Sequence, residues 1–434
     1  MKGIVLVWAV MMFISFGSSE DSNSVMDVSD YDKYLSIGAE ADEQKAEREF
    51  GFWYTKYLAA PNQYTFLVKM AAAQNQLFKY NGDISHLANA TAYLAEANEL
   101  SYEESPSILR ALAKNYISEH RFRKALSSLE KAENLEYQLQ ATYKMLYDVH
   151  MELGNDKMAY AYLERLDDKG SFDYTIRQAK WQDHIGDLDE AIFKMNLALK
   201  SAEESANENL ILWTVTNLGD FYGHKGDIRL SYEHYLRALE LDPANAYAKK
   251  GLAWIAFSHE KNVEEANRIL DNINKYYDTP DYLLLRAEMA EYNGDELSKE
   301  GYLEQYFESM NLIGDQAHMY NKYNVMLYAD STETREEAKC IAMEEISLRP
   351  ISQSYSLLAY AYLKDGEIDE ATRIVYEQII GHTSEPEPLL IAAMVLKEVD
   401  GDVKDSETYV NLKSDLIGSI YELGPTQEAV IQEL

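Results

Sequence analysis

The sequence predicts an all-α protein in which pairs of short helices stack one after another into a solenoid. Only 8 of its 434 residues are proline, which interrupts helix interiors. Small residues recur at a period near 34 residues, and Gly-Asp pairs at 82–83, 186–187 and 226–227 are typical of the turns that end helices. One helix pair cannot bury its apolar face alone, so neighbouring pairs are expected to stack.

The small residue that begins the second helix of each pair gives the period. From Ala125 to Ala159 the interval is 34 residues, and it is then 32, 40 and 35 residues to Ala191, Ser231 and Ala266. Small side chains at these positions allow the backbones of two helices to approach closely. The near-constant interval therefore favours repeated helix pairs over a globular domain of unrelated helices.

The most complete copy lies at residues 212–245. It contains Leu218, Gly219, Tyr222, Gly226, Asp227, Ser231, Tyr235, Ala238 and Pro243. This pattern resembles the tetratricopeptide repeat, a helix-turn-helix unit of 34 residues. The resemblance covers about residues 62–400 and implies a right-handed solenoid, in which Gly219 is expected to face Ser231 at the helix crossing.

The N-terminus carries an apolar run at residues 4–16, preceded by Lys2 and followed by small residues. The run is too short to cross a bilayer as a helix, and it has the form of a secretory signal. Residues 1–19 are therefore predicted to be a signal peptide, with an uncleaved anchor as the alternative. We expect an exported bacterial protein of the periplasm, cell surface or extracellular space, with no transmembrane span in the mature chain.

Two segments are expected between the signal and the solenoid. Residues 20–41 are acidic and partly rich in serine, which predicts disorder. Residues 42–61 are predicted to form an N-terminal capping helix that ends at Pro61. Its apolar face contains Phe50, Trp53, Tyr54, Tyr57 and Leu58. This face is expected to cover the open end of the solenoid, although a partner-binding helix is the alternative.

The tetratricopeptide-like solenoid is expected to span residues 62–402. The stretch 295–330 keeps helical periodicity but lacks the small residues of the repeat, so the solenoid is expected to bend there. Residues 403–434 are predicted to be a C-terminal capping helix and a polar tail, because Gly424-Pro425 is a helix stop signal.

The charge of the chain limits its partners. It has 40 Lys and Arg against 74 Asp and Glu, a formal net charge of −34. Such a surface repels phosphate backbones, so we do not expect nucleic acid as a partner. The single cysteine, Cys340, excludes a disulfide within one chain and is expected to be a small core residue.

Catalytic motifs are missing from the sequence. It has no Gly-x-Ser-x-Gly, no phosphate-binding glycine loop and no His-Glu-x-x-His. Residues 400–402 resemble a calcium loop only superficially, because Lys404 stands where an oxygen ligand is required. We therefore predict a protein that is not an enzyme and that has no cofactor, metal site or catalytic residue.

Repeat phase predicts a ligand-binding surface. In tetratricopeptide repeats, particular positions of the first helix face the concave groove. Mapped onto this sequence, they give Arg110, Lys114, Lys144, Arg177, Lys180, Trp213, Asn217, Tyr247 and Lys250. Family members that hold a peptide carboxylate use Lys and Asn at such positions, so the resemblance implies a protein or peptide partner. Simple balancing of nearby glutamates is the alternative.

We therefore expect a non-enzymatic exported scaffold that binds an extended peptide or protein segment in its concave groove. The alternative is an envelope glycan-binding protein. The chain is also similar to the starch-utilisation outer-membrane proteins, which use comparable repeats with aromatic platforms. The missing lipid-anchor cysteine after the signal run argues against that alternative.

Overall fold

The computed structural model describes residues 24–399 and 406–434, and within these ranges it forms helices and no strand. The segment expected to be a signal peptide, 1–19, and the residues 400–404 of the superficial calcium loop lie outside the described residues. In chain order the helical elements are α1 Val28–Leu35, α2 Glu40–Ala59, α3 Tyr64–Asn81, α4 Ile84–Leu100, α5 Pro106–Ser118, α6 Phe122–Asn134, α7 Leu139–Glu152, α8 Asp156–Glu164, α9 Phe172–His184, α10 Leu188–Glu204, α11 Glu208–His224, α12 Ile228–Leu241, α13 Ala246–Ser258, α14 Val263–Ile273, α15 Pro280–Tyr292, α16 Glu296–Ile313, the 3₁₀ segment η1 Gly314–Tyr320, α17 Asn321–Asp330, α18 Arg335–Leu348, α19 Ser352–Asp365, α20 Ile368–Ile374, the π-helical segment η2 Val375–Ile379, α21 Pro386–Glu398, α22 Glu407–Gly418, α23 Ile420–Leu423 and α24 Pro425–Glu433.

The Gly-Asp pairs form the turns inside the helix pairs. At Gly226, φ is 82°, a left-handed conformation that glycine adopts without a Cβ clash and that ends α11. The carboxylate of Asp227 then accepts a hydrogen bond from the backbone N–H of Leu230 and caps α12. Gly186 and Asp187 do the same between α9 and α10. One dipeptide therefore both ends the first helix of a pair and starts the second.

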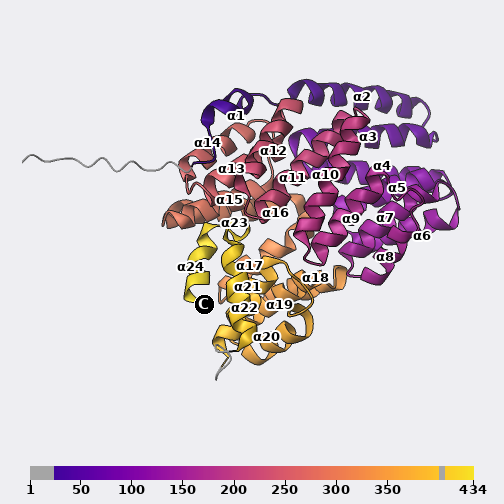
Figure 1. Cartoon of the computed structure of the whole chain (residues 1–434). Helices are drawn as coiled ribbons and strands as arrows, with labels where there is room; N and C mark the ends of the chain where they lie inside the picture. The colour runs from indigo at the N-terminus through magenta and orange to yellow at the C-terminus, as the bar shows by residue number, and fades with distance from the viewer. Residues whose placement is uncertain (1–23, 400–405) are drawn as a thin grey trace, which may run out of the picture.

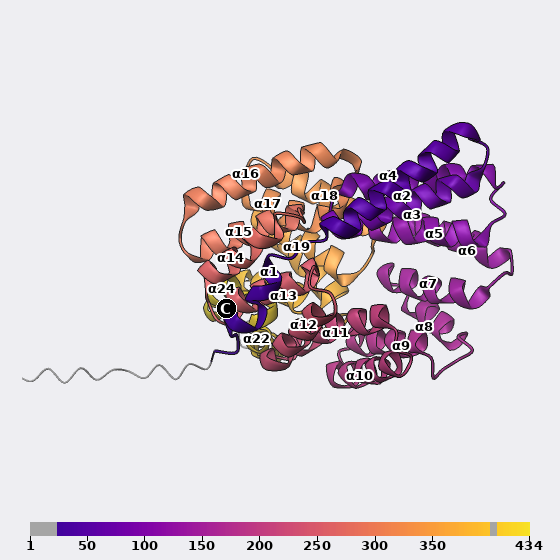
Figure 2. The same ribbon diagram turned by 90° about the horizontal axis from the view of Figure 1, so that it is seen from above.

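The helix pairs follow a curve, with the odd-numbered helices α3 to α15 on its inner side and the even-numbered helices α4 to α16 outside (Figure 2). Neighbouring inner helices such as α5, α7 and α9 contact one another directly, as elements on the inside of a curve do. We call the face that the inner helices turn toward the centre the inner surface. The architecture is the right-handed, all-α solenoid of tetratricopeptide-like repeats that the sequence predicts, and the prediction is confirmed.

The curve closes on itself after α16. The backbone N–H of Asp278, between α14 and α15, donates to the carbonyl oxygen of Asn81 at the end of α3, at 3.0 Å. Ile84 at the start of α4 packs in one apolar cluster with Tyr306 and Met310 of α16. Helices α3 to α16 thus form one complete superhelical turn, which we call the first turn.

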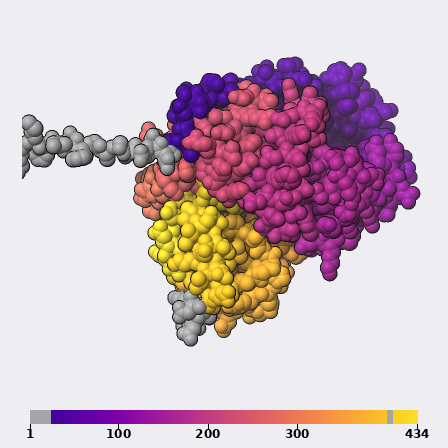
Figure 3. Space-filling view, in the orientation of Figure 1, coloured from indigo at the N-terminus to yellow at the C-terminus, as the bar shows by residue number. Residues whose placement is uncertain are grey.

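The elements after α16, from η1 to α24, form a second turn that stacks on the first (Figure 1). Figure 3 shows the two turns meeting along a seam. The seam includes an ion pair between Arg349 Nη2 and Glu152 Oε2 at 2.9 Å, and a hydrogen bond from Trp254 Nε1 to the carbonyl oxygen of Tyr421 at 3.1 Å. Glu152 and Trp254 lie near the C-terminal ends of α7 and α13, so the second turn packs against that edge of the first.

Helix α1 shows that the prediction of a disordered segment at 20–41 is wrong for its described part. Its Tyr31 and Leu35 are buried against α12 and α14. The hydroxyl of Tyr31 donates to Glu265 Oε1 at 2.6 Å. Acidic composition alone predicted disorder, but these contacts with a distant part of the chain order the segment. We call residues 24–39 the N-terminal strap.

Helix α2 lies where the capping helix was expected, at 42–61, and it packs along α3. Trp53 lies 6.0 Å from the ring of Phe66 in α3. Two other members of its apolar face, Tyr54 and Leu58, are 43 % and 63 % exposed. Only part of the expected apolar face is therefore used for packing.

The C-terminus also differs from the prediction for 403–434. Instead of one helix and a polar tail, the described part holds α22, α23 and α24. Pro425 occupies the first turn of α24, where its fixed φ suits a helix start, so Gly424-Pro425 begins a helix after ending the one before. Ile431 of α24 is buried in the core of the second turn. The expected tail is therefore a packed helix.

The ring of Tyr235 in α12 leaves room only for glycine at two positions of the best-matching repeats. A Cβ atom on Gly219 would lie 2.7 Å from Cε1 of Tyr235, and a Cβ atom on Gly251 would lie 2.5 Å from its Cζ. The buried ring is thus enclosed by bare backbone of α11 and α13. Gly219 was expected to face Ser231, but the larger ring of Tyr235, one helical turn further along, fills that space.

We expect Gly251→Ala to lower the free energy of unfolding by about 1–3 kcal/mol, the usual cost of overpacking, because the new methyl group would overlap the Tyr235 ring. Chemical denaturation would measure the loss. The matched control is Gly301→Ala in α16, where a Cβ atom meets nothing within 4 Å. A Gly251→Ala protein as stable as the control would contradict this packing.

Glu288 of α15 links α24 to the first superhelical turn. The hydroxyl of Thr426 donates to Glu288 Oε1 at 2.7 Å. Burial raises the pKa of Glu288 to about 7, because desolvation disfavours the carboxylate; the hydrogen bond from Thr426 opposes this rise, and Glu291 adds to it. The protonated form of Glu288 is therefore favoured by folding.

Because this pKa is raised above its ordinary value of 4.5, the stabilisation is fully present below about pH 4.5 and is lost as pH rises through about 7. We expect the melting temperature of the wild type to fall more between about pH 5 and 8 than that of Glu288→Gln, which cannot ionise. The corresponding difference in the free energy of unfolding should be on the order of 1–3 kcal/mol, since one pKa unit corresponds to about 1.4 kcal/mol. Calorimetry across this range measures it, and identical pH profiles would disprove the assignment.

Candidate functional site

Two of the nine predicted groove residues are buried structural side chains. Arg110 donates to Thr142 Oγ1 at 3.2 Å and to Gln138 Oε1 at 2.8 Å, which fixes the start of α7. Arg177 donates to Asp148 Oδ2 at 2.6 Å and to the carbonyl oxygen of Lys144 at 3.0 Å, which joins α9 to α7. Both guanidinium groups link neighbouring inner helices, so their hydrogen bonds are directed at the protein itself.

The more accessible lysines of the predicted stripe pair with carboxylates from the next helix pair or the one before. Lys144 contacts Asp173, Lys180 Nζ lies 3.0 Å from Glu152 Oε1, and Lys250 Nζ lies 3.9 Å from Asp281 Oδ2. Lys114 is exposed. The inner surface therefore alternates positive and negative charge, whereas the sequence had predicted a positive stripe.

Glu152 connects this surface to the second turn. Its two oxygens contact Lys180 at 3.0 Å and Arg349 at 2.9 Å. Burial alone would raise the pKa of Glu152, but the two cations outweigh it and bring the pKa below its ordinary value. Burial likewise acts to lower the pKa of Lys180, and Glu152 and Asp148 overcome it, so that this pKa is raised. Both groups therefore remain charged at neutral pH.

Two aromatic rings remain accessible on adjacent inner helices. Trp213 in the second helical turn of α11 is 41 % exposed, and Tyr247 in the first helical turn of α13 is 55 % exposed. They occupy the same position of successive repeats, 34 residues apart. Asn217, the remaining predicted residue, donates to the carbonyl oxygen of Trp213 at 2.7 Å. We call these two accessible rings the aromatic shelf.

Asp220 is a residue of this surface that the sequence analysis missed. Its carboxylate accepts hydrogen bonds from Tyr235 at 2.5 Å and from Tyr247 at 2.7 Å. Burial raises its pKa although both hydrogen bonds act in the opposite direction. A signal was present, because Asp220 stands at the repeat position that carries Lys114 and Lys180 in other pairs.

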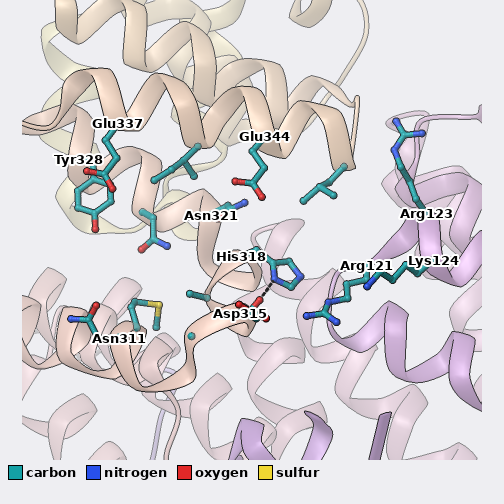
Figure 4. A pocket seen from close by; sticks show the side chains of 16 residues that line it. Arg121, Arg123, Lys124, Asn311, Asp315, His318, Asn321, Tyr328, Glu337 and Glu344 are labelled. Carbon is teal, nitrogen blue, oxygen red and sulfur yellow. Dashed lines mark hydrogen bonds between the residues drawn. The ribbon is translucent and has the colours of Figure 1, made fainter. Parts of the chain in front are cut away.

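A separate cleft of 690 Å³ opens at the seam between the two turns (Figure 4). Arg121, Arg123 and Lys124, before and in the first turn of α6, line one wall, which we call the basic wall. Glu337 and Glu344 of α18 line another side, which we call the acidic wall, and the two walls adjoin where the Nε of Arg123 donates to the carbonyl oxygen of Ser347 at 2.7 Å. The end of α16 and segment η1, with Asn311 and Asp315, lie across the cleft from the acidic wall (Figure 4).

The cleft was not predicted from the sequence. Its basic wall is visible there as three cations within four residues of an acidic chain. The other elements that line the cleft, however, follow about 190 residues later, and only the stacking of the turns brings them together. A pattern that runs along the chain therefore cannot reveal this cleft.

The described residues contain no group of three or more His, Cys, Asp or Glu side chains arranged to hold a metal ion. Among these residues there is also no helix with the length and apolarity needed to span a bilayer. Cys340 of α18 is exposed, which corrects the expectation of a core cysteine.

The tetratricopeptide repeat family matches residues 214–245 of this chain, the α11–α12 pair. A comparison with curated proteins found no match. Among solved structures, a human IFIT1 dimer with PPP-AAAA is 16 % identical, with 72 % of this chain and 71 % of that chain covered and a TM-score of 0.45. A signal transduction ATPase with a tetratricopeptide repeat sensor from Pyrococcus horikoshii is 16 % identical, covering 83 % and 54 % at a TM-score of 0.37. The Cut9–Hcn1 hetero-tetramer of the APC/C is 13 % identical, covering 94 % and 99 % at a TM-score of 0.34. With TM-scores this low, these three likenesses carry no argument about ligands.

Proposed function

We propose that this chain is a non-enzymatic scaffold that holds an extended peptide or protein segment on the inner surface of its first turn. The observation that carries the proposal is the accessible pair of rings, Trp213 and Tyr247, at the same position of adjacent repeats. Aromatic side chains of this kind supply much of the contact energy at protein interfaces. Repetition of one position along a solenoid suits a ligand that is itself extended and periodic.

The charges around the shelf support a peptide as the ligand. Lys180, Lys250 and Asp220 offer both signs of charge within the same surface. A polypeptide carries both signs as well as backbone donors and acceptors, so it can complement such a surface along its length. A nucleic acid carries only negative charge and would meet a chain with a net charge of −34.

A photo-reactive amino acid in place of Tyr247 tests this proposal directly. We expect irradiation of cells to give a discrete cross-linked species whose adduct is a peptide of another protein. The matched control carries the same amino acid in place of Leu297, which is 83 % exposed on outer helix α16. Adducts of equal yield from both positions would show general surface contact and would count against an inner site.

The identified segment, made as a peptide, then allows affinity measurements. We expect Trp213→Ala and Lys250→Glu each to weaken binding about tenfold, since the first removes contact area and the second reverses a charge one helical turn from Tyr247 on α13. The control Glu304→Lys alters an exposed charge on α16 and should leave affinity unchanged. A sugar adduct at position 247 in the cross-linking experiment would instead support the glycan-binding alternative, because exposed rings also suit pyranose faces.

We also propose that the scaffold is exported, on the basis of the apolar run at residues 4–16 and the small residues after it. Sequencing of the mature N-terminus should find a start within a few residues of Glu20 in protein from the cell envelope or the medium. Recovery of soluble cytosolic protein that still begins at Met1 would refute export.

A further inference from the structure

Two buried amides line the cleft between the two superhelical turns. Asn321 and Asn324 of α17 are 6 % and 8 % exposed, and they lie three residues apart, which places them on one face of the helix. The Nδ2 of Asn321 donates to Glu345 Oε2 at 3.2 Å, and the Oδ1 of Asn324 accepts from the hydroxyl of Tyr306 at 2.9 Å. The packing around α17 thus uses one half of each amide.

The other half of each amide is open to the cleft. Among the described residues, Asn321 Oδ1 and Asn324 Nδ2 have no hydrogen-bond partner, and both atoms remain accessible to solvent. An acceptor and a donor, one helical turn apart, are therefore available to a ligand. Because the buried half of each side chain is already fixed, binding costs little in lost side-chain freedom.

The acidic wall supplies further acceptors. Glu337 and Glu344 are exposed, and no cation of the described residues lies within 4.0 Å of either carboxylate. Ile341 lies between them on the same face of α18 and also borders the cleft. This wall therefore presents two accessible carboxylates on either side of an aliphatic patch.

Tyr328 of α17 gives the cleft an aromatic surface. Its ring stacks on Phe307 of α16, with centroids 5.4 Å apart and planes 9° apart. Its hydroxyl has no hydrogen-bond partner among the described residues, and burial raises its pKa, with Glu337 adding to the rise. Figure 4 shows Tyr328 and Glu337 at one end of the cleft, away from the basic wall. A fixed apolar ring thus lies beside unused hydrogen-bonding groups.

The charges that line the cleft balance one another. Three arginine and lysine side chains and three carboxylates contribute, namely Arg121, Arg123, Lys124, Asp315, Glu337 and Glu344. The whole chain, with a net charge of −34, repels polyanions, and the basic wall repels polycations. The lining therefore favours a neutral ligand that carries both donors and acceptors.

We propose that this cleft binds a neutral oligosaccharide. Each hydroxyl group both donates and accepts, so neighbouring hydroxyls can accept from Asn324 Nδ2 while they donate to Asn321 Oδ1 and to the acidic wall. The apolar C–H face of a pyranose ring packs on Tyr328. A peptide backbone offers one donor per residue and suits this acceptor-rich lining less well. The volume of 690 Å³ is in the range of specific small-molecule sites, and the site is distinct from the inner surface.

The first test offers the full mature chain an array of neutral oligosaccharides built from glucose, galactose, mannose or N-acetylglucosamine. Heparin fragments and an end-blocked glutamine decapeptide are included as a charged saccharide and a neutral peptide. We expect at least one neutral oligosaccharide to bind, with a dissociation constant of about 1 mM or lower by calorimetry. An array on which no neutral oligosaccharide binds, or on which heparin or the decapeptide binds more tightly, would overturn the proposal.

The second test removes the groups that the saccharide uses. Asn324→Asp keeps the oxygen that accepts from Tyr306 and replaces the free donor by an acceptor, so affinity for the bound oligosaccharide should fall about tenfold. Glu337→Ala/Glu344→Ala removes two acceptors and should also cost about tenfold in affinity. Both glutamates are exposed, so this second protein keeps its fold, which a thermal melt followed by circular dichroism checks.

The matched control is Glu233→Ala/Glu240→Ala on outer helix α12, where two exposed glutamates have the same seven-residue spacing. This protein has the same change in charge and should bind as the wild type does. Wild-type affinity in the Glu337→Ala/Glu344→Ala protein would refute the site, and an equal loss in the control would assign binding to overall charge and refute it too. Binding in the cleft and cross-linking at Tyr247 are measured independently, so either proposal can fail alone.

Discussion

The carboxylate of Glu152 lies between Lys180 of the inner surface and Arg349 of the second turn, and the stacking of the two turns depends on contacts of this kind. Partly buried ion pairs contribute little net stability, because desolvation offsets the Coulomb attraction, but removing one partner is costly. We infer that Glu152 acts mainly on specificity. It favours the register in which the end of α7 meets Arg349, and alternative ways of stacking would leave charges unpaired. The cleft and the docking of α24 lie at the same interface between the two turns.

The sequence was informative wherever structure depends on neighbouring residues. The Gly226-Asp227 turn, the small residues at helix crossings and the pairing of helices follow from steric and hydrogen-bonding rules within about 34 residues. Repeat phase also placed Trp213 and Tyr247 on an accessible face. It could not show that Arg177 forms an ion pair with Asp148, because that depends on whether a neighbouring repeat supplies a carboxylate within reach.

The features that escaped prediction arise between segments far apart in the chain. The N-terminal strap has an acidic composition, yet Tyr31 is buried and its hydroxyl donates to Glu265. Repeat periodicity reflects contacts within a helix pair and between adjacent pairs. It carries no information about contacts between one superhelical turn and the next. The inner surface is thus a product of the repeat itself, and the seam cleft is a product of the place, near η1, where the repeat is interrupted.

The N-terminal strap has a consequence for the order in which the chain acquires its structure. Ile37 is held by Lys249, 212 residues further along, and Tyr31 by Glu265, 234 residues further along. At about 5–20 residues per second, ribosomes need roughly 10–50 s to make the partners after the strap has emerged. The strap therefore has no native partners while the repeats that follow it form early, since local contacts form fastest. The first described residues to be synthesised are thus among the last to find their native partners.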